Sequence, residues 1–131
     1  MKNPSKIILF SFVLLLTLGL FGCKTTPIYN VEHASVVVSD QASMNEIKKA
    51  IMVAGAGLGW NMEETKPGVI TGTLYVRDHM AKVQIPYSKN EYSIRYLDSY
   101  ALRYDGTNIH KNYNVWIQDL DHAIRARLIA L

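Results

Sequence analysis

Apolar and polar residues alternate along four stretches in the second half of the chain, and this period of two predicts β-strands. The stretches are residues 60–65, 69–77, 81–85 and 92–97. The turns between them, such as Lys66-Pro67-Gly68, are too short for a crossover, so neighbouring strands must pair antiparallel as a meander. A β-branched run at 34–39 predicts one more strand earlier in the chain.

Two other stretches repeat apolar residues every three to four positions, which predicts helices. The first begins at a capping box formed by Ser43 and Glu46, and it ends in a glycine-rich segment at 55–59. The second is long and amphipathic, with apolar positions at Tyr113, Trp116, Ile117, Leu120, Ile124, Leu128 and Leu131. Tyrosines at 92, 96, 100 and 104 could also form a helical stripe, but the preceding turn favours a strand followed by an irregular corner.

The predicted fold class is α+β, with an antiparallel sheet and elements in the order β-α-β-β-β-β-α. Polar residues of the meander fall on one face of the sheet, which should therefore be exposed to water. Both helices should pack on the other face. Asn108, just after the turn at Asp105-Gly106, is the expected cap of the long helix.

The N-terminus has a different pattern, in which Lys2 and Lys6 precede a nearly unbroken apolar run over residues 7–18. This run is shorter than the ~20 residues of a spanning helix, and its basic start is typical of a secretory signal. It leads to Leu20-Phe21-Gly22-Cys23, which holds the only cysteine of the chain and resembles the lipobox of bacterial lipoproteins. Phe21 departs from that pattern, which usually has a small residue there.

The lipobox resemblance implies cleavage before Cys23 and attachment of a diacylglycerol and acyl chains to this residue. Several acyl chains anchor a protein firmly, whereas one holds it only marginally. The sorting rule of the enteric lipoproteins that this motif resembles sends a protein without aspartate after the cysteine to the outer membrane. Lys24 holds that position here, so the resemblance implies the outer membrane, with the domain facing the periplasm. We therefore predict a signal peptide at 1–22, a lipidated cysteine and tether at 23–32, and one α+β domain at 33–131.

The order of elements resembles helix-grip or TBP-like domains, which occur in outer-membrane assembly lipoproteins such as the C-type lipoprotein of the β-barrel assembly machine. The chain is also similar to small proteobacterial lipoproteins, particularly over Ile109-His110, Tyr113-Asn114 and Trp116. Both resemblances imply a role at the cell envelope, with a membrane and an envelope protein as partners.

Charge and motifs exclude several other classes. Without Lys2 and Lys6 the chain has 12 basic residues against 11 acidic ones, so no cationic surface for nucleic acid is expected. The four histidines lack the spacing of metal ligands, and we predict no metal and no cofactor. Gly55-Ala56-Gly57-Leu58-Gly59 follows a predicted helix rather than a strand, so it is not a dinucleotide motif.

Two groups of residues are candidates for function. Tyr75, Arg77, Lys82 and Arg95 would share the exposed face of the sheet and could form an interaction surface, although an ordinary polar sheet surface would look the same. Asp98, Ser99 and His110 lie in the corner before the long helix. Those three could form a catalytic set, but no nucleophile motif accompanies them, so we expect a structural role.

We therefore predict a non-enzymatic interaction or scaffold module, anchored at the cell envelope. The alternative is a carrier that holds an apolar ligand in a cavity between the long helix and the sheet. A cell-wall hydrolase is a third hypothesis. The space beneath the long helix separates the first two, since a scaffold would fill it and a carrier would leave a lined void.

Overall fold

Five strands form one antiparallel sheet in the computed structural model, which describes residues 24–131. From edge to edge these are β2 (Val31–Ser35), β6 (Glu91–Tyr100), β5 (His79–Pro86), β4 (Val69–Val76) and β3 (Asn61–Lys66). The predicted meander is thus confirmed, and β2 adds to its far edge by pairing with β6. The predictions of a signal peptide and of lipidation at Cys23 fall on residues that lie outside the described part.

The register of the sheet follows the alternation of the sequence. Ile70 lies opposite Ile85, and both side chains are fully buried, whereas Thr71 opposite Gln84 and Thr73 opposite Lys82 are half-exposed. The turn between β3 and β4 places Gly68 at φ 81°, a backbone conformation that suits glycine. One face of the sheet is therefore apolar and covered, and the other is polar and open.

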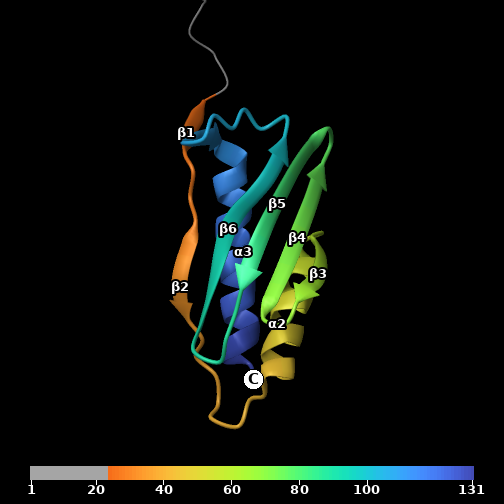
Figure 1. The fold of residues 1–131 in the computed structure, drawn as a ribbon, viewed down its shortest axis with the longest axis vertical. Helices are drawn as coiled ribbons and strands as arrows, with labels where there is room; N and C mark the ends of the chain where they lie inside the picture. The colour runs from red at the N-terminus through yellow and green to blue at the C-terminus, as the bar shows by residue number, and fades with distance from the viewer. Residues whose placement is uncertain (1–23) are drawn as a thin grey trace, which may run out of the picture.

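Both helices lie side by side on the apolar face (Figure 1). They are α2 (Met44–Gly57) and α3 (Lys111–Ile129). The capping box is confirmed, because Ser43 Oγ accepts from Glu46 N–H at 3.2 Å and Glu46 Oε2 accepts from Ser43 N–H at 2.8 Å. The α+β class and the packing of both helices on one face are as predicted.

The space between α3 and the sheet is filled by buried apolar side chains. Residues of α3 with at most 1% exposure are Tyr113, Ile117, Leu120, Ile124 and Leu128. Trp116 is only half-buried at the margin of this core, and Leu131 is 41% exposed. The prediction that both belong to the buried face of the helix is therefore wrong. Trp60, just before β3, is the buried tryptophan.

Two fully buried tyrosines differ in how their hydroxyl groups are paired. Tyr92 donates to Asp121 Oδ1 at 2.5 Å, and Asp121 Oδ2 accepts from Arg125 Nε at 2.9 Å. Burial, followed by the contact with Asp121, raises the pKa of Tyr92 above its usual range. The hydroxyl of Tyr113 has no hydrogen-bond partner in the part of the chain that the structure describes, and burial raises its pKa as well.

A second, two-stranded sheet corrects the predicted tether. β1 (Thr25–Pro27) pairs antiparallel with β7 (Asn108–His110), and Ile28 N–H donates to Thr107 O at 2.9 Å. The side chain of Asn114 also donates to Pro27 O at 2.9 Å. Most of the segment at 24–32 is therefore part of the folded domain. Strands of three residues are too short to leave a periodic pattern in the sequence.

The boundaries of two predicted strands also differ. β2 starts at Val31 and ends at Ser35, earlier than the predicted 34–39, and a bulge interrupts its register between Val31 and Ala34. His33 lies in this bulge at φ 50°. β6 continues to Tyr100 beyond the predicted end at 97, with its own bulge opposite Lys82 and Val83. The helical alternative for this tyrosine-rich stretch is therefore wrong.

No helix between residues 24 and 131 has both the length and the apolar character needed to cross a membrane.

Candidate interaction face of the sheet

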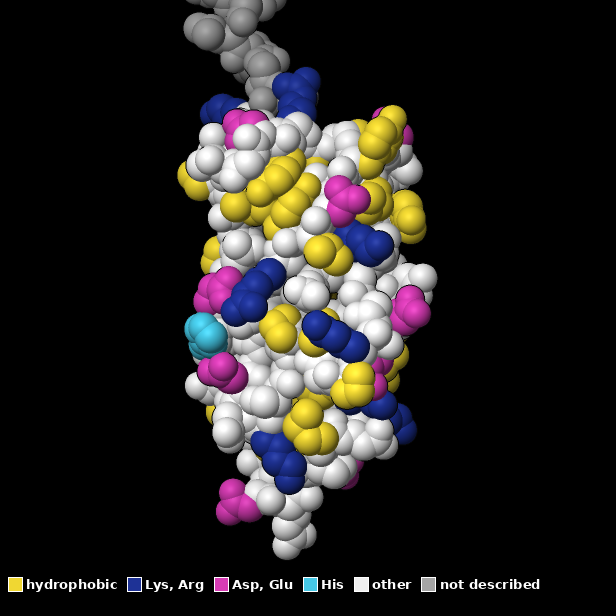
Figure 2. All heavy atoms as spheres, viewed as in Figure 1, with side chains coloured by type: hydrophobic (Ala, Val, Ile, Leu, Met, Phe, Trp, Pro, Cys, Tyr) yellow, Lys and Arg dark blue, Asp and Glu magenta, His cyan; other side chains and the backbone are white. Residues whose placement is uncertain are grey.

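The face of the sheet opposite the helices is open, and Figure 2 shows it toward the viewer. We call it the open face. Its side chains come from alternate positions of β2 to β6, and the register places them in three bands across the strands. Charged side chains are scattered over it, and the largest hydrophobic area lies toward the end where β1 is found.

The first band is aromatic. Met80 of β5 lies opposite Tyr75 of β4 on one side and Tyr100 of β6 on the other. Tyr75 is 72% exposed and Tyr100 is 68% exposed. Tyrosine combines a large apolar ring with few rotatable bonds, so it gives up little entropy when a partner covers it. This band has the composition of a protein-binding surface.

The second band surrounds Lys82 and a shallow hollow of about 320 Å³. Its lining residues include Asn61, Glu63, Thr71, Lys82 and Leu97. Lys82 pairs with Asp98 and Val83 with Tyr96, so Leu97 is the extra residue of the β6 bulge. The bulge takes Leu97 out of the regular alternation of the strand, and its side chain lines this hollow and is 45% exposed.

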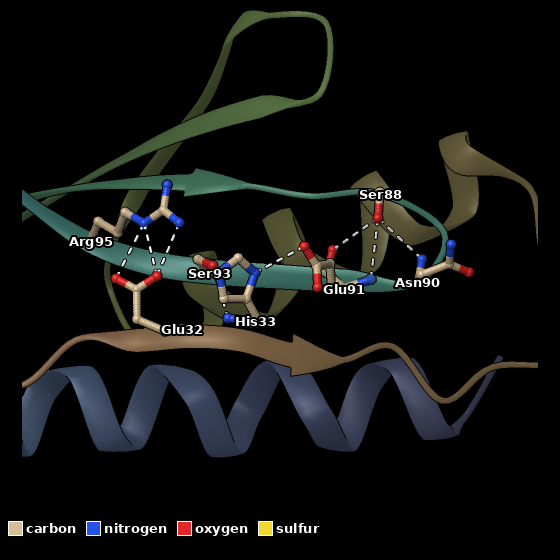
Figure 3. Close-up of polar contacts among 7 residues, drawn as sticks. All are labelled: Glu32, His33, Ser88, Asn90, Glu91, Ser93 and Arg95. Atoms are coloured by element: carbon tan, nitrogen blue, oxygen red, sulfur yellow. Dashed lines mark hydrogen bonds and ion pairs between the residues drawn. The ribbon is translucent and has the colours of Figure 1, made fainter.

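The third band lies at the β2 edge and is held by polar contacts (Figure 3). The ring of His33 contacts Glu91 Oε1 through Nδ1 at 2.9 Å, and Ser93 Oγ accepts from the backbone N–H of His33 at 3.0 Å. Ser88 caps the adjoining turn, since its Oγ accepts from the N–H groups of Asn90 and Glu91, each at 3.2 Å. The positive φ of His33 is thus stabilised by contacts on both its backbone and its side chain.

Arg95 completes this band by forming a bidentate ion pair with Glu32 (Figure 3). Its Nε and Nη2 donate to Glu32 Oε2 at 3.1 and 2.9 Å. The hydrogen bonds and charge of Glu32 raise the pKa of the guanidinium further, so it stays charged. A hollow of about 290 Å³ lies between these groups and Tyr87. Because Arg95 and Glu32 hold each other in place, the remaining donor and acceptor atoms of this band have fixed positions.

Of the four residues predicted for the interaction surface, three share the open face. These are Tyr75, Lys82 and Arg95. Arg77 lies beyond the end of β4, in the turn to β5, at φ 57°. Sequence reasoning did not find Glu32, His33, Leu97 or Tyr100 as members of this face. Finding them requires the position of the two bulges, which the alternation of the sequence does not reveal.

The corner residues Asp98 and Ser99 stabilise local structure. Asp98 Oδ1 accepts from the N–H of Ser99 at 2.8 Å, as expected for a group that bonds a local amide. Ser99 Oγ instead contacts the hydroxyl of Tyr96 at 2.8 Å. The strand continues through both residues, which pair with Lys82 and Ala81. They therefore belong to the end of β6 rather than to the irregular corner.

His110 is the cap of α3, so the assignment of that role to Asn108 is wrong. His110 Nδ1 accepts from the N–H of Asn112 at 3.1 Å, and Asn108 is the first residue of β7. Asp105 holds the preceding turn by accepting from the N–H groups of Asn108 and Thr107, and these bonds lower its pKa. A histidine ring nitrogen can cap a helix as an oxygen does, but histidine is rarely read as a cap signal.

Among the described residues, Asp98 and Ser99 are joined through the backbone N–H of Ser99, the hydroxyl of Ser99 contacts Tyr96, and neither residue is hydrogen-bonded to His110. Among residues 24–131, no group of three histidine, cysteine or acidic side chains is placed to hold a metal ion. His79 has a structural contact of its own, because its Nδ1 lies 2.9 Å from Ala101 O.

Comparisons with known proteins add no further constraint. The chain matches no family model, no curated protein and no solved structure with which it was compared.

Proposed function

We propose that this chain is a lipid-anchored, non-enzymatic module that binds an envelope protein through the open face of its sheet. The observation that carries the proposal is a sheet with one face covered by two helices and the other left bare, with Tyr75, Leu97 and Tyr100 exposed on it. Exposed aromatic groups beside charged pairs are typical of protein interfaces, where aromatic residues and arginine are enriched.

The packing beneath α3 supports an interaction module over a carrier of apolar ligands. Ile117 and Leu120 have 0% exposure, so their side chains are enclosed by other protein atoms. None of the four hollows described between residues 24 and 131 is lined by Trp116 or by either of these residues. A carrier would need room in this layer, and the filled layer favours a rigid support for the open face.

Anchoring is the part of the proposal that rests on sequence. Cys23→Ala should abolish labelling by a radioactive or clickable fatty acid and leave the precursor uncleaved. The matched control is Ser5→Ala, which alters the same segment outside the lipobox and should leave labelling unchanged. Labelling that survives Cys23→Ala would contradict the lipoprotein assignment and the outer-membrane location with it.

Binding through the open face is tested by crosslinking in living cells. A photoreactive phenylalanine analogue replaces Leu97 in the middle of this face, and in a second strain it replaces Gln118 on the exposed side of α3. We expect one protein to crosslink from position 97 and not from position 118. This product should disappear when Lys82→Glu is added and persist with Lys49→Glu on α2. Crosslinking from position 118 alone would assign binding to the helical face.

A further inference from the structure

The folded domain begins at residue 24, with no linker before its first strand, so residue 23 must lie beside the end of the domain that holds β1. Lys24 O accepts from the N–H of Lys111, the first residue of α3, at 3.4 Å, and β1 begins at the next residue. Only Lys24 separates Cys23 from the β1–β7 sheet. The expected flexible tether of about ten residues is therefore replaced by one residue.

Two other segments lie at the same end of the molecule (Figure 1). These are the β4–β5 turn at 77–78 and the corner at 101–107. Backbone and ring contacts join them: His79 Nδ1 lies 2.9 Å from Ala101 O, and His110 N–H donates to Leu102 O at 2.8 Å. The rings of His79 and His110 are 6.1 Å apart. Together with Lys24 and the start of α3, these segments form one continuous end surface, which we call the anchor end.

Basic side chains dominate the exposed groups of the anchor end. Lys24, Arg77, Arg103 and Lys111 are all exposed, and none forms an ion pair with another residue in the range 24–131. The acidic groups nearby are partly engaged. The carboxylate of Asp105 accepts two backbone N–H groups, and Asp78 lies 3.7 Å from His79 Nε2. Both carboxylates keep their negative charge, so Lys24, Arg77, Arg103 and Lys111 against Asp78 and Asp105 give this end a net charge of +2.

Tyr104 adds an aromatic group to the anchor end, where it is 38% exposed. Tyrosine and tryptophan are enriched where proteins meet lipid headgroups, because the ring suits the boundary between water and acyl chains. Basic residues close to an anionic leaflet each contribute about 1 kcal/mol of attraction, or about fivefold in binding.

We propose that the anchor end rests directly on an anionic lipid surface, so that the sheet stands upright on the membrane. This inference rests on the proposed lipidation of Cys23, which would place the acyl chains one residue from the end surface. The strands run along the long axis of the domain, and the turn at 88–90 lies at the opposite end (Figure 1). The length of α3, 19 residues, sets the height of the domain at about 28 Å or more.

The test uses the full chain, lipidated in a bacterial host and reconstituted into vesicles of phosphatidylethanolamine and phosphatidylglycerol. A fluorophore is attached to a single new cysteine, either Thr107→Cys at the anchor end or Asn90→Cys at the opposite end. Both positions are exposed, and the bonds that the structure gives them use the backbone. Lipids with a nitroxide on the headgroup then quench any fluorophore near the membrane surface.

We expect strong quenching at position 107 and little at position 90. Equal quenching at both positions, with lipidation confirmed by mass spectrometry, would mean that the domain tumbles, and it would overturn the upright arrangement while the anchor stands. Protein that lacks the lipid and does not float with the vesicles would overturn the anchor itself, and the upright arrangement with it.

Reversing the charge of basic residues at the anchor end tests whether they hold the domain on the membrane surface, or whether the lipid anchor alone keeps it there. Arg103→Glu with Lys111→Glu should reduce the ratio of docked to undocked domains by at least about 25-fold, since each charge contributes about fivefold. Glutamate is favourable in the first turn of a helix, so the change at 111 should not destabilise α3. Lys66→Glu with Lys89→Glu at the opposite end is the matched control and should leave quenching at position 107 unchanged. If both pairs behave alike, the basic residues do not dock the domain.

Discussion

Replacing either buried tyrosine by phenylalanine removes one hydroxyl, and the structure predicts a loss of stability at one position and none at the other. Tyr92 and Tyr113 are 1% and 0% exposed, so each variant keeps the ring and leaves no large cavity. The hydroxyl of Tyr92 donates to Asp121, whereas no residue of the described chain pairs with the hydroxyl of Tyr113. The comparison therefore contrasts a buried hydroxyl that has a hydrogen-bond partner with one that has none.

The expected magnitudes follow from these partners. Tyr92→Phe removes a hydrogen bond to a charged group and leaves Asp121, which is 6% exposed, with Arg125 alone, at a cost of about 1.5–3 kcal/mol. Tyr113→Phe removes a buried hydroxyl that has no partner, which should be neutral or stabilise the fold by up to about 2 kcal/mol. The two variants should differ by about 1.5–5 kcal/mol in the free energy of unfolding.

Urea unfolding of residues 24–131, followed by tryptophan fluorescence, measures this difference. With a urea slope of about 1–2 kcal/mol per molar, the two midpoints should lie about 0.7 M or more apart. Tyr75→Phe on the open face is the control and should stay within about 0.5 kcal/mol of the parent, since Tyr75 is 72% exposed. Equal shifts in the same direction for positions 92 and 113 would refute the assigned hydrogen-bond pattern.

Three further predictions concern the N-terminal strand, the margin of the core and alkaline pH. A chain that starts at Val31 lacks β1 and its hydrogen bonds, so its free energy of unfolding should be at least about 2 kcal/mol lower than that of a chain that starts at Lys24. Equal urea midpoints for the two chains would show that β1 does not stabilise the domain. Trp116→Ala should cost roughly 2 kcal/mol, below the ~3–5 of a fully buried aromatic, and a larger loss would place Trp116 in the core. Burial and the contact with Glu64 raise the pKa of Tyr87 to about 12, so the folded state holds this proton more tightly than the unfolded one. Stability should therefore be intact below about pH 10 and fall toward pH 12, and Tyr87→Phe should make that fall shallower.

The sequence predicts the sheet well where two signals agree. In the meander, alternation and turn chemistry point to the same strands, and Gly68 adopts the conformation that the turn requires. The capping box at Ser43 is likewise a local signal that needs no knowledge of the rest of the chain. Such features are encoded within a few residues, so a single sequence reveals them.

Features that depend on distant pairing could not be predicted in this way. β1 has only three residues, and its partner β7 lies more than 80 positions later in the chain. The bulge at His33 displaces one strand, and the bulge beside Leu97 changes which side chains reach the open face. For this reason the sequence identified Lys82 and Arg95 as members of the open face and missed Glu32 and Leu97.

The β1–β7 pair also sets how the domain responds to force. Under the proposed anchoring at Cys23 and binding through the open face, a partner that pulls on that face would load the chain between the two, and the first structure on this path is a ladder of three residue pairs. So short a ladder should peel before the five-stranded sheet does. Peeling would free residues 24–30, which extend to roughly 24 Å. The freed segment would then act as an extended tether, and a lipid-anchored domain, as proposed here, could stay bound to a partner that moves away from the membrane.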